Sequence, residues 1–317
     1  MKKTLFSLFM LALLPVLTFA QADQKLMNKA QQGDTKAMVL LGECYENGAG
    51  VDVDSTLALK WFQRAADQGD GEGWLRISRY YLHSTLLPRD TARYFAIRKE
   101  WADKGLPNGF AALATCYEYG FGVAVDSAKA LELNQQAVKA NAAWGYDNMA
   151  SNLAYGYGSL AKDEKKAVSY WEKAHKLGEL SSCGDLAGHY LVKGDYKKAK
   201  KWAQEGAKWN DATSQTLIAL MYFNGDGEKE DEAKAQQILS DLIAKRHNLR
   251  FTQAVAGEAY MYPDDVSLRD SAKAIRIWEE GSHFNPLSAS LCQMDLGRYY
   301  NSIGQYEKAF RYRSSLI

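Results

Sequence analysis

The sequence predicts an all-α fold, an α/α solenoid that forms a right-handed superhelix of about eight helix-turn-helix repeats. Three observations predict it. The segment at 41–51 returns almost letter for letter at 113–123, which is 72 residues further on. An alanine, replaced once by tyrosine, recurs at steps of 32–39 residues, and glycine or asparagine usually follows eleven residues later. Periods of this length are typical of stacked helix pairs, in which each repeat packs only on its neighbours.

An alanine near the start of each predicted second helix defines the register. This slot, here named the alanine slot, is filled by Ala58, Tyr94, Ala130, Ala167, Ala199, Ala235, Ala274 and Ala309. Eleven residues later lie the expected helix ends, Gly69, Gly105, Asn141, Gly178, Asn210, Arg246 and Asn285, with Gly33 one step upstream. Glycine and asparagine tolerate the left-handed backbone that ends a helix, so only Arg246 departs from the pattern.

Each predicted first helix carries a small residue three positions before a large one. The pairs are Gly42/Tyr45, Ser78/Tyr81, Ala114/Tyr117, Ala150/Leu153, Ala187/Tyr190, Ala219/Tyr222, Gly257/Tyr260 and Gly297/Tyr300. Residues three apart share a helix face, so the small residue should admit a neighbouring helix while the large one packs beside that contact. Burying each large side chain should stabilise the fold by about 1.5–3 kcal/mol.

The turn within a repeat is rich in glycine, as in Gly120-Phe121-Gly122, and an aspartate follows it. Asp54 and Asp126 stand where the N-cap of the next helix is expected. Gly194-Asp195-Tyr196 opens a shorter turn, which accounts for the 32-residue step. No long linker interrupts the array, so we predict one repeat domain over residues 21–317, with terminal caps at 23–32 and 305–314.

The motif Leu-Gly-x-x-Tyr-x-x-Gly-x-Gly-Val, followed by Lys-Ala-x-x-Trp and Ala-Ala-x-x-Gly, resembles the Sel1-like repeat family, a branch of the tetratricopeptide-like superfamily. The resemblance covers residues 25–317 and is clearest in the repeats that contain 41–51 and 113–123. It implies a helical scaffold with an adaptor or assembly role. Related exported repeat proteins carry paired cysteines that bridge the two helices of each repeat, and this chain lacks that pairing.

Residues 1–20 resemble a cleavable bacterial Sec-type signal peptide. Lys2 and Lys3 precede an apolar run at 5–17, and Ala20 and Ala22 offer small residues at a cleavage point. The alternative is an uncleaved anchor, but the run is shorter than the roughly 20 residues that span a bilayer. We therefore expect a periplasmic or secreted protein with no stable membrane insertion after the leader is removed.

Charge and cysteine content narrow the possible partners. The formal net charge is +1, and it becomes −1 when Lys2 and Lys3 leave with the leader. Neither value indicates nucleic acid or an anionic membrane as an obligate partner. Cys44 and Cys116 occupy one slot two repeats apart, and Cys183 and Cys292 lie three repeats apart. A disulfide needs Cα atoms within about 7 Å, so we expect four small buried thiols instead.

The sequence shows no pattern typical of catalysis, a metal or a cofactor. Cys183 and His189 are six residues apart on one predicted helix and so lie on different faces, which favours packing over metal binding. The glycine-rich segment at 69–73 follows a helix rather than a strand, so it is interpreted as a turn between repeats and not as a phosphate loop. We expect no catalytic residue, metal site or cofactor.

The first helices of such solenoids line the concave face. The register points three positions of each first helix into that groove: one residue after the small slot, and one and two residues after the large slot. The candidate peptide-binding residues are Glu118, Tyr119, Tyr155, Phe223 and Asn224. They would hold an extended or helical protein segment. The alternative is that Tyr119 and Tyr155 pack against the loop of a neighbouring repeat.

These observations favour a non-enzymatic exported scaffold that binds protein or peptide partners on its concave face. One alternative is a hydrolase acting on cell-wall or antibiotic substrates, for which Glu118 with His83 is the pair to inspect. Another is a structural component of an envelope assembly. The identity of the partner is not encoded in these patterns.

Overall fold

The structure is a computed structural model that describes residues 24–83, 89–244, 252–281 and 286–314. Over these residues the chain consists of helices and turns without a strand, which confirms the predicted all-α class. The predicted leader at 1–20 lies outside the described residues, as do Arg246 and Asn285. Among the described helices, none combines the length and the apolar character needed to cross a bilayer.

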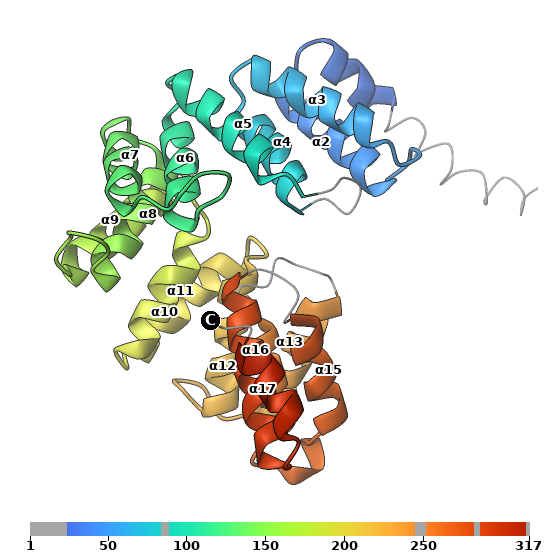
Figure 1. Cartoon of the computed structure of the whole chain (residues 1–317), viewed down its shortest axis with the longest axis vertical. Helices are drawn as coiled ribbons and strands as arrows, with labels where there is room; N and C mark the ends of the chain where they lie inside the picture. Colours follow the sequence, from blue (N-terminus) through green and yellow to red (C-terminus); the bar gives the residue numbers. More distant parts are fainter. Residues whose placement is uncertain (1–23, 84–88, 245–251, 282–285, 315–317) are drawn as a thin grey trace, which may run out of the picture. The chain divides into compact units, whose positions relative to one another are not determined.

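The chain forms two compact units, and the first comprises Met1–Asp163. Within it, residues 24–31 are helical, and seven further helices follow (Figure 1). Their bounds are α2 Thr35–Asn47, α3 Ser55–Asp67, α4 Gly71–His83, α5 Thr91–Asp103, α6 Pro107–Tyr119, α7 Ser127–Lys139 and α8 Ala143–Tyr155. The even-numbered helices are the first helices of the repeats, and the odd-numbered helices are the second.

The second unit comprises Glu164–Ile317. It continues the alternation, with one short 3-10 helix in the divergent loop of the seventh repeat. The bounds are α9 Glu164–Lys176, α10 Ser182–Val192, α11 Tyr196–Ala207, α12 Ala212–Asn224, α13 Glu232–Ala244, α14 Thr252–Met261, η1 Val266–Leu268, α15 Ser271–Gly281, α16 Pro286–Ser302 and α17 Tyr306–Ser314.

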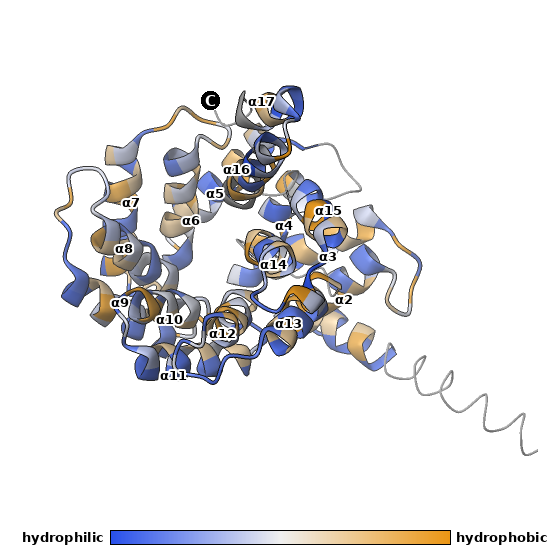
Figure 2. Cartoon of the chain, turned by 90° about the horizontal axis from the view of Figure 1, so that it is seen from below, coloured by the Kyte–Doolittle hydropathy of each residue, from blue (hydrophilic) through white to orange (hydrophobic). Residues whose placement is uncertain are grey.

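The predicted register is confirmed helix by helix. All eight alanine-slot residues fall in odd-numbered helices and are buried. The described helices from α2 to α17 form eight pairs, as predicted. Within each unit successive helices pack together, and α6 also contacts α8, as α12 contacts α14. The helices carry hydrophobic and hydrophilic residues along their length, as amphipathic packing requires (Figure 2).

Close approach of the two helices at the small slots is also confirmed. A methyl group added at Gly42 would lie 2.7 Å from Cδ1 of Phe62 on α3. One added at Gly257 would overlap the indole ring of Trp278 on α15. Alanine or serine fills the small slot from the second to the sixth repeat and is buried there. The small residue therefore sets the distance between the helices of a repeat.

The large slots differ from the expectation of full burial, because most of their tyrosines are only partly buried. Tyr222 is an example, and the Lys234 ammonium lies 4.0 Å from its ring centroid and 2.8 Å from its hydroxyl oxygen. Lys273 covers Tyr260 in the same way, at 4.1 Å and 2.8 Å. The basic residue comes just before the alanine slot, so one face of the ring packs on the core and the other receives a cation.

Predicted helix ends are confirmed where they are described. Asp54 accepts hydrogen bonds from the amides of Thr56 and Leu57, both at 2.9 Å, and Asp126 caps α7 in the same way. Asn141 and Asn210 adopt left-handed backbone conformations, with φ of 55° and 57°. These two asparagines therefore end their helices as glycine does elsewhere.

None of the four cysteines forms a disulfide. Cys116, Cys183 and Cys292 are buried as predicted, but Cys44 is only partly buried. Cys116 packs with Leu82 and Tyr94 of the preceding repeat. Cys44 fills the same repeat position in the first repeat, where it is only partly buried.

Candidate binding surface on the first helices

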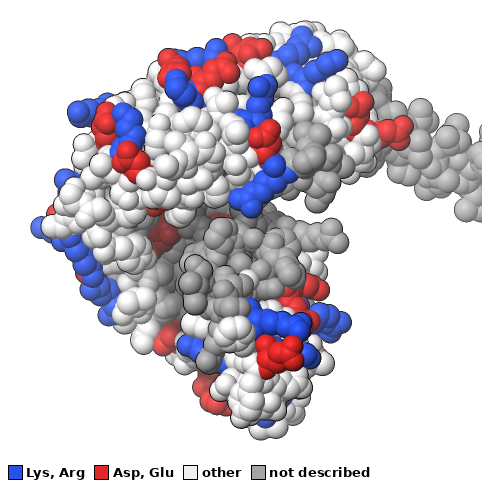
Figure 3. Space-filling view, viewed as in Figure 1, with Lys and Arg blue, Asp and Glu red and all other residues white. Residues whose placement is uncertain are grey.

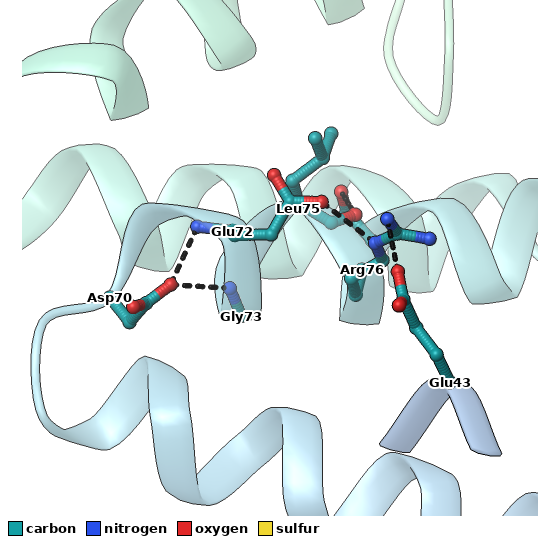
Figure 4. A network of polar contacts seen from close by, with 7 residues as sticks. Glu43, Asp70, Glu72, Gly73, Leu75 and Arg76 are labelled. Atoms are coloured by element: carbon teal, nitrogen blue, oxygen red, sulfur yellow. Dashed lines mark hydrogen bonds and ion pairs between the residues drawn. The ribbon is translucent and has the colours of Figure 1, made fainter. Parts of the chain in front are cut away.

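A polar network ties the first helices of the first two repeats together. Asp70 begins α4 and accepts hydrogen bonds from the amides of Glu72 and Gly73, at 2.9 and 3.1 Å, so the glycine-rich segment is the predicted turn (Figure 4). Arg76 then pairs with Glu72 at 2.7 Å and with Glu43 on α2. The bridge from α4 to α2 fixes the spacing of neighbouring first helices.

In the first unit, the candidate residues lie at the ends of α6 and α8, which contact each other. Tyr119 is the last residue of α6 and is 61% exposed; Tyr155 is the last residue of α8 and is 81% exposed. The Tyr119 ring lies 5.9 Å from the ring of Phe121, which belongs to the loop of its own repeat. Both tyrosines therefore present most of their side chain to solvent.

Glu118 precedes the first of these tyrosines and is partly buried. Burial raises the pKa of Glu118, and a hydrogen bond with Tyr119 opposes that shift. The carboxylate is therefore held beside an exposed ring at the edge of the surface. His83, its proposed catalytic partner, has a side chain outside the described residues, so the predicted pair stays a prediction.

Phe223 and Asn224 belong to the second unit and end α12. Asn224 is exposed, and its amide donates a hydrogen bond to Asp226 at 3.2 Å. Phe223 is only partly accessible because it packs against the hydrophobic core that includes Leu239 and Tyr260. Of the two residues, Asn224 is the more accessible to a ligand, while Phe223 also supports the fold.

The sequence patterns missed a buried carboxyl group in the second unit. Asp295 on α16 is only 7% exposed, and its Oδ1 lies 3.4 Å from Nη1 of Arg298. Burial raises the pKa of Asp295 to about 6; the nearby charge of Glu258 on α14 adds to the shift, and Arg298 opposes it. Glu258 and Arg298 occupy projected groove positions, but Asp295 does not, so only packing reveals the cluster.

Asp295 should make stability depend on pH. Its pKa rises from a usual 3.8 to about 6, so the ionised form is disfavoured in the folded protein. This cost to stability develops as pH increases from 3.8 to about 6 and is fully present above that range. We expect Asp295→Asn to raise the free energy of unfolding at pH 8 by at most about 3 kcal/mol, and the melting temperature with it. At pH 4 both should change little. Thermal unfolding at both pH values measures this, and an equal shift at both would contradict it.

The Cys183 thiol and the His189 ring make separate contacts. The Cys183 thiol lies 3.3 Å from Nδ1 of His175 on α9, whereas the His189 ring packs 5.9 Å from Trp171 and 5.5 Å from Tyr190. Burial raises the pKa of Cys183 to about 12, so its thiol stays protonated. Over the described ranges, no three metal-binding side chains cluster.

Helix pairs in constant register, with first helices presented side by side, define a helical-repeat solenoid. The Sel1 repeat matches residues 35–70, 111–141, 147–179, 174–208 and 212–240. The chain belongs to the Sel1 repeat family.

Two known proteins are similar in sequence to part of this chain. An uncharacterized protein of Neisseria meningitidis serogroup B is 27% identical over 210 residues, which cover 66% of this chain and 43% of that protein. Chitin synthase regulatory factor 3 of Schizosaccharomyces pombe is 35% identical over 104 residues, covering 32% of this chain and 11% of that protein. The chain therefore spans less than half of the length of either relative.

Two solved structures align with the chain, and the first of them shares its fold. A Sel1 repeat protein from Oxalobacter formigenes has a TM-score of 0.51 and 22% identity, covering 74% of this chain and 98% of that one. The structure of c5321, a protective antigen of uropathogenic Escherichia coli with the Sel1-like repeat fold, has a TM-score of 0.43 and 24% identity, covering 92% and 70%.

Proposed function

We propose that this protein is a non-enzymatic scaffold that is exported and binds protein or peptide partners on its first-helix surface. The exposure of Tyr119 and Tyr155 at equivalent positions of neighbouring first helices carries the proposal. Tyrosine combines a large apolar ring with a hydroxyl and loses little conformational entropy on binding, so exposed tyrosines are common anchors for protein partners. The adjacent Glu118 carboxylate favours a partner with a basic side chain near its apolar contacts.

Family membership supports the same proposal. Sel1 repeats generally mediate protein interactions. The matching yeast protein is named a regulatory factor of chitin synthase, which accords with action through a partner. Export rests on the predicted leader, and a mature protein that begins at Gln21 or Asp23 would support it.

The test begins with crosslinking in the native cell and identification of the captured proteins. The dissociation constant of each purified partner is then measured for the native chain and for Tyr155→Ala. We expect at least about a tenfold weaker complex, because loss of a central aromatic anchor removes both apolar contact and a hydrogen bond. Phe223→Ala tests the second unit separately.

Tyr306→Ala is the matched control, because Tyr306 is also well exposed, at 69%, but lies on the second helix α17. It should leave the affinity unchanged. Full affinity after both Tyr119→Ala and Tyr155→Ala would remove this part of the first-helix surface as the binding site.

A further inference from the structure

The chain as a whole is nearly neutral, but one segment of it is strongly basic. Residues 164–208, which include α9 to α11, contain ten lysines, no arginine and six acidic residues, a net charge of +4 (10 − 6). Since the whole chain carries +1, the remaining residues sum to −3. Lysine side chains follow one another along the edge where Figure 1 places these helices (Figure 3).

The second helices α9 and α11 carry eight of these ten lysines. The His175 ring of α9 lies 5.5 Å from the Trp202 ring of α11, so the two helices meet at these rings. Lys165 on α9 and Lys197 on α11 fill the same repeat slot, two residues before the alanine slot. Lys201 lies one turn after Lys197 and shares its helix face. Lys165, Lys197 and Lys201 are all exposed to solvent on these two helices.

Part of this charge is not neutralised. Lys193, Lys198, Lys200 and Lys208 pair with carboxylates at 2.6–2.9 Å. In the portion of the chain that the structure describes, Lys165, Lys176, Lys197 and Lys201 have no carboxylate within ion-pair distance. Lys201 only lies over the Trp202 ring, at 5.6 Å. We name these four residues the lysine face.

A large exposed aromatic residue lies at one end of the lysine face. Trp209 is the second residue after α11 and is 59% exposed, although a hydrogen bond links it to Glu205. Tryptophan is enriched at membrane–water interfaces because its ring is apolar and its ring nitrogen remains hydrated. A row of lysines beside an exposed tryptophan combines the two features that bind proteins to anionic lipid surfaces.

We propose that the lysine face, with Trp209, binds the headgroups of anionic phospholipids and holds the protein against a membrane surface. Lysine is a mobile point charge without the rigid fork of arginine, so four lysines suit a fluid layer of phosphates better than one fixed carboxylate or phosphate. The contact uses the second helices and leaves the first-helix surface available to a protein partner. It is therefore independent of the function proposed above.

The proposal is tested by cosedimentation of the full chain with vesicles of phosphatidylcholine alone or with one third phosphatidylglycerol. We expect phosphatidylglycerol to increase binding at least tenfold at low salt, and high salt to abolish that gain. The double variant Lys197→Glu with Lys201→Glu should lose at least nine-tenths of the gain. Trp209→Ala should reduce binding severalfold at every salt concentration.

The matched control is Lys60→Glu with Lys139→Glu. Both residues are exposed on second helices of the first unit, Lys60 fills the same slot as Lys201, and the change in net charge is identical. The residues at 1–23 are the same in all variants, so any contribution of the leader cancels. Equal losses in the two double variants, no gain with phosphatidylglycerol, or equally tight binding of duplex DNA or an acidic peptide would overturn the proposal.

Discussion

Gly122→Ala should destabilise the first unit by about 2–4 kcal/mol, far more than the same substitution at most other glycines. Gly122 has a φ of 71°, a conformation that costs any residue with a Cβ about 1–2 kcal/mol. The added methyl would also overlap the carbonyl oxygen of Thr91 and lie 2.8 Å from Cβ of Phe95, both on α5 of the preceding repeat. Because the carbonyl is backbone, it cannot move without disturbing the start of α5.

Gly105→Ala separates the two causes. Gly105 has nearly the same φ, 70°, but an added methyl would meet no atom within 4 Å. It should cost only about 1 kcal/mol, the strain of the backbone alone. Urea denaturation followed by circular dichroism measures both variants. If Gly122→Ala lost no more stability than Gly105→Ala, the close contact between the loop and the preceding repeat would be disproved.

Trp278→Ala should cost about 3–5 kcal/mol in the second unit. The Trp278 side chain is fully buried, fits the space left by the missing side chain of Gly257, and donates a hydrogen bond to the carbonyl of Ala254 at 3.3 Å. Removing it leaves a large cavity between α14 and α15 and removes the hydrogen bond to Ala254. We expect an earlier urea midpoint and a weaker near-ultraviolet dichroism signal.

Trp209→Ala is the control for this substitution. Trp209 is mostly exposed, so its loss should change the free energy of unfolding by less than about 0.5 kcal/mol. A similar loss of stability in both variants would contradict the assignment of Trp278 to the core. The control also shows whether Trp209→Ala is folded when it is used in the vesicle experiment.

The local register was predictable because it depends on interactions within one repeat and its neighbour. Ala58 and its seven equivalents have to be small or flat where the second helix packs, and Asn141 and Asn210 have to tolerate a left-handed backbone. Such requirements recur once per repeat, so eight weak signals reinforce one another. The exposure of Tyr119 and Tyr155 followed from the same register.

Features that combine residues from different helices were not predictable in this way. The burial of Asp295 depends on how α14 and α16 pack, and periodicity carries no information about one unusual residue in a single repeat. The net charge gave no sign of the lysine face, because a sum over the whole chain cancels Lys197 and Lys201 against distant acidic residues. Cys44 fills the same repeat position as Cys116, but it is only partly buried whereas Cys116 is buried.

By itself, the sequence determined the helix pairs, their ends and the spacing of the repeats, because these follow from side-chain size and backbone preference at fixed intervals. Only the tertiary structure decided which tyrosines receive a cation over the ring, which carboxyl group is buried and which lysines remain unpaired. Those properties arise from distances between side chains on separate helices, and the packing of the repeats sets these distances.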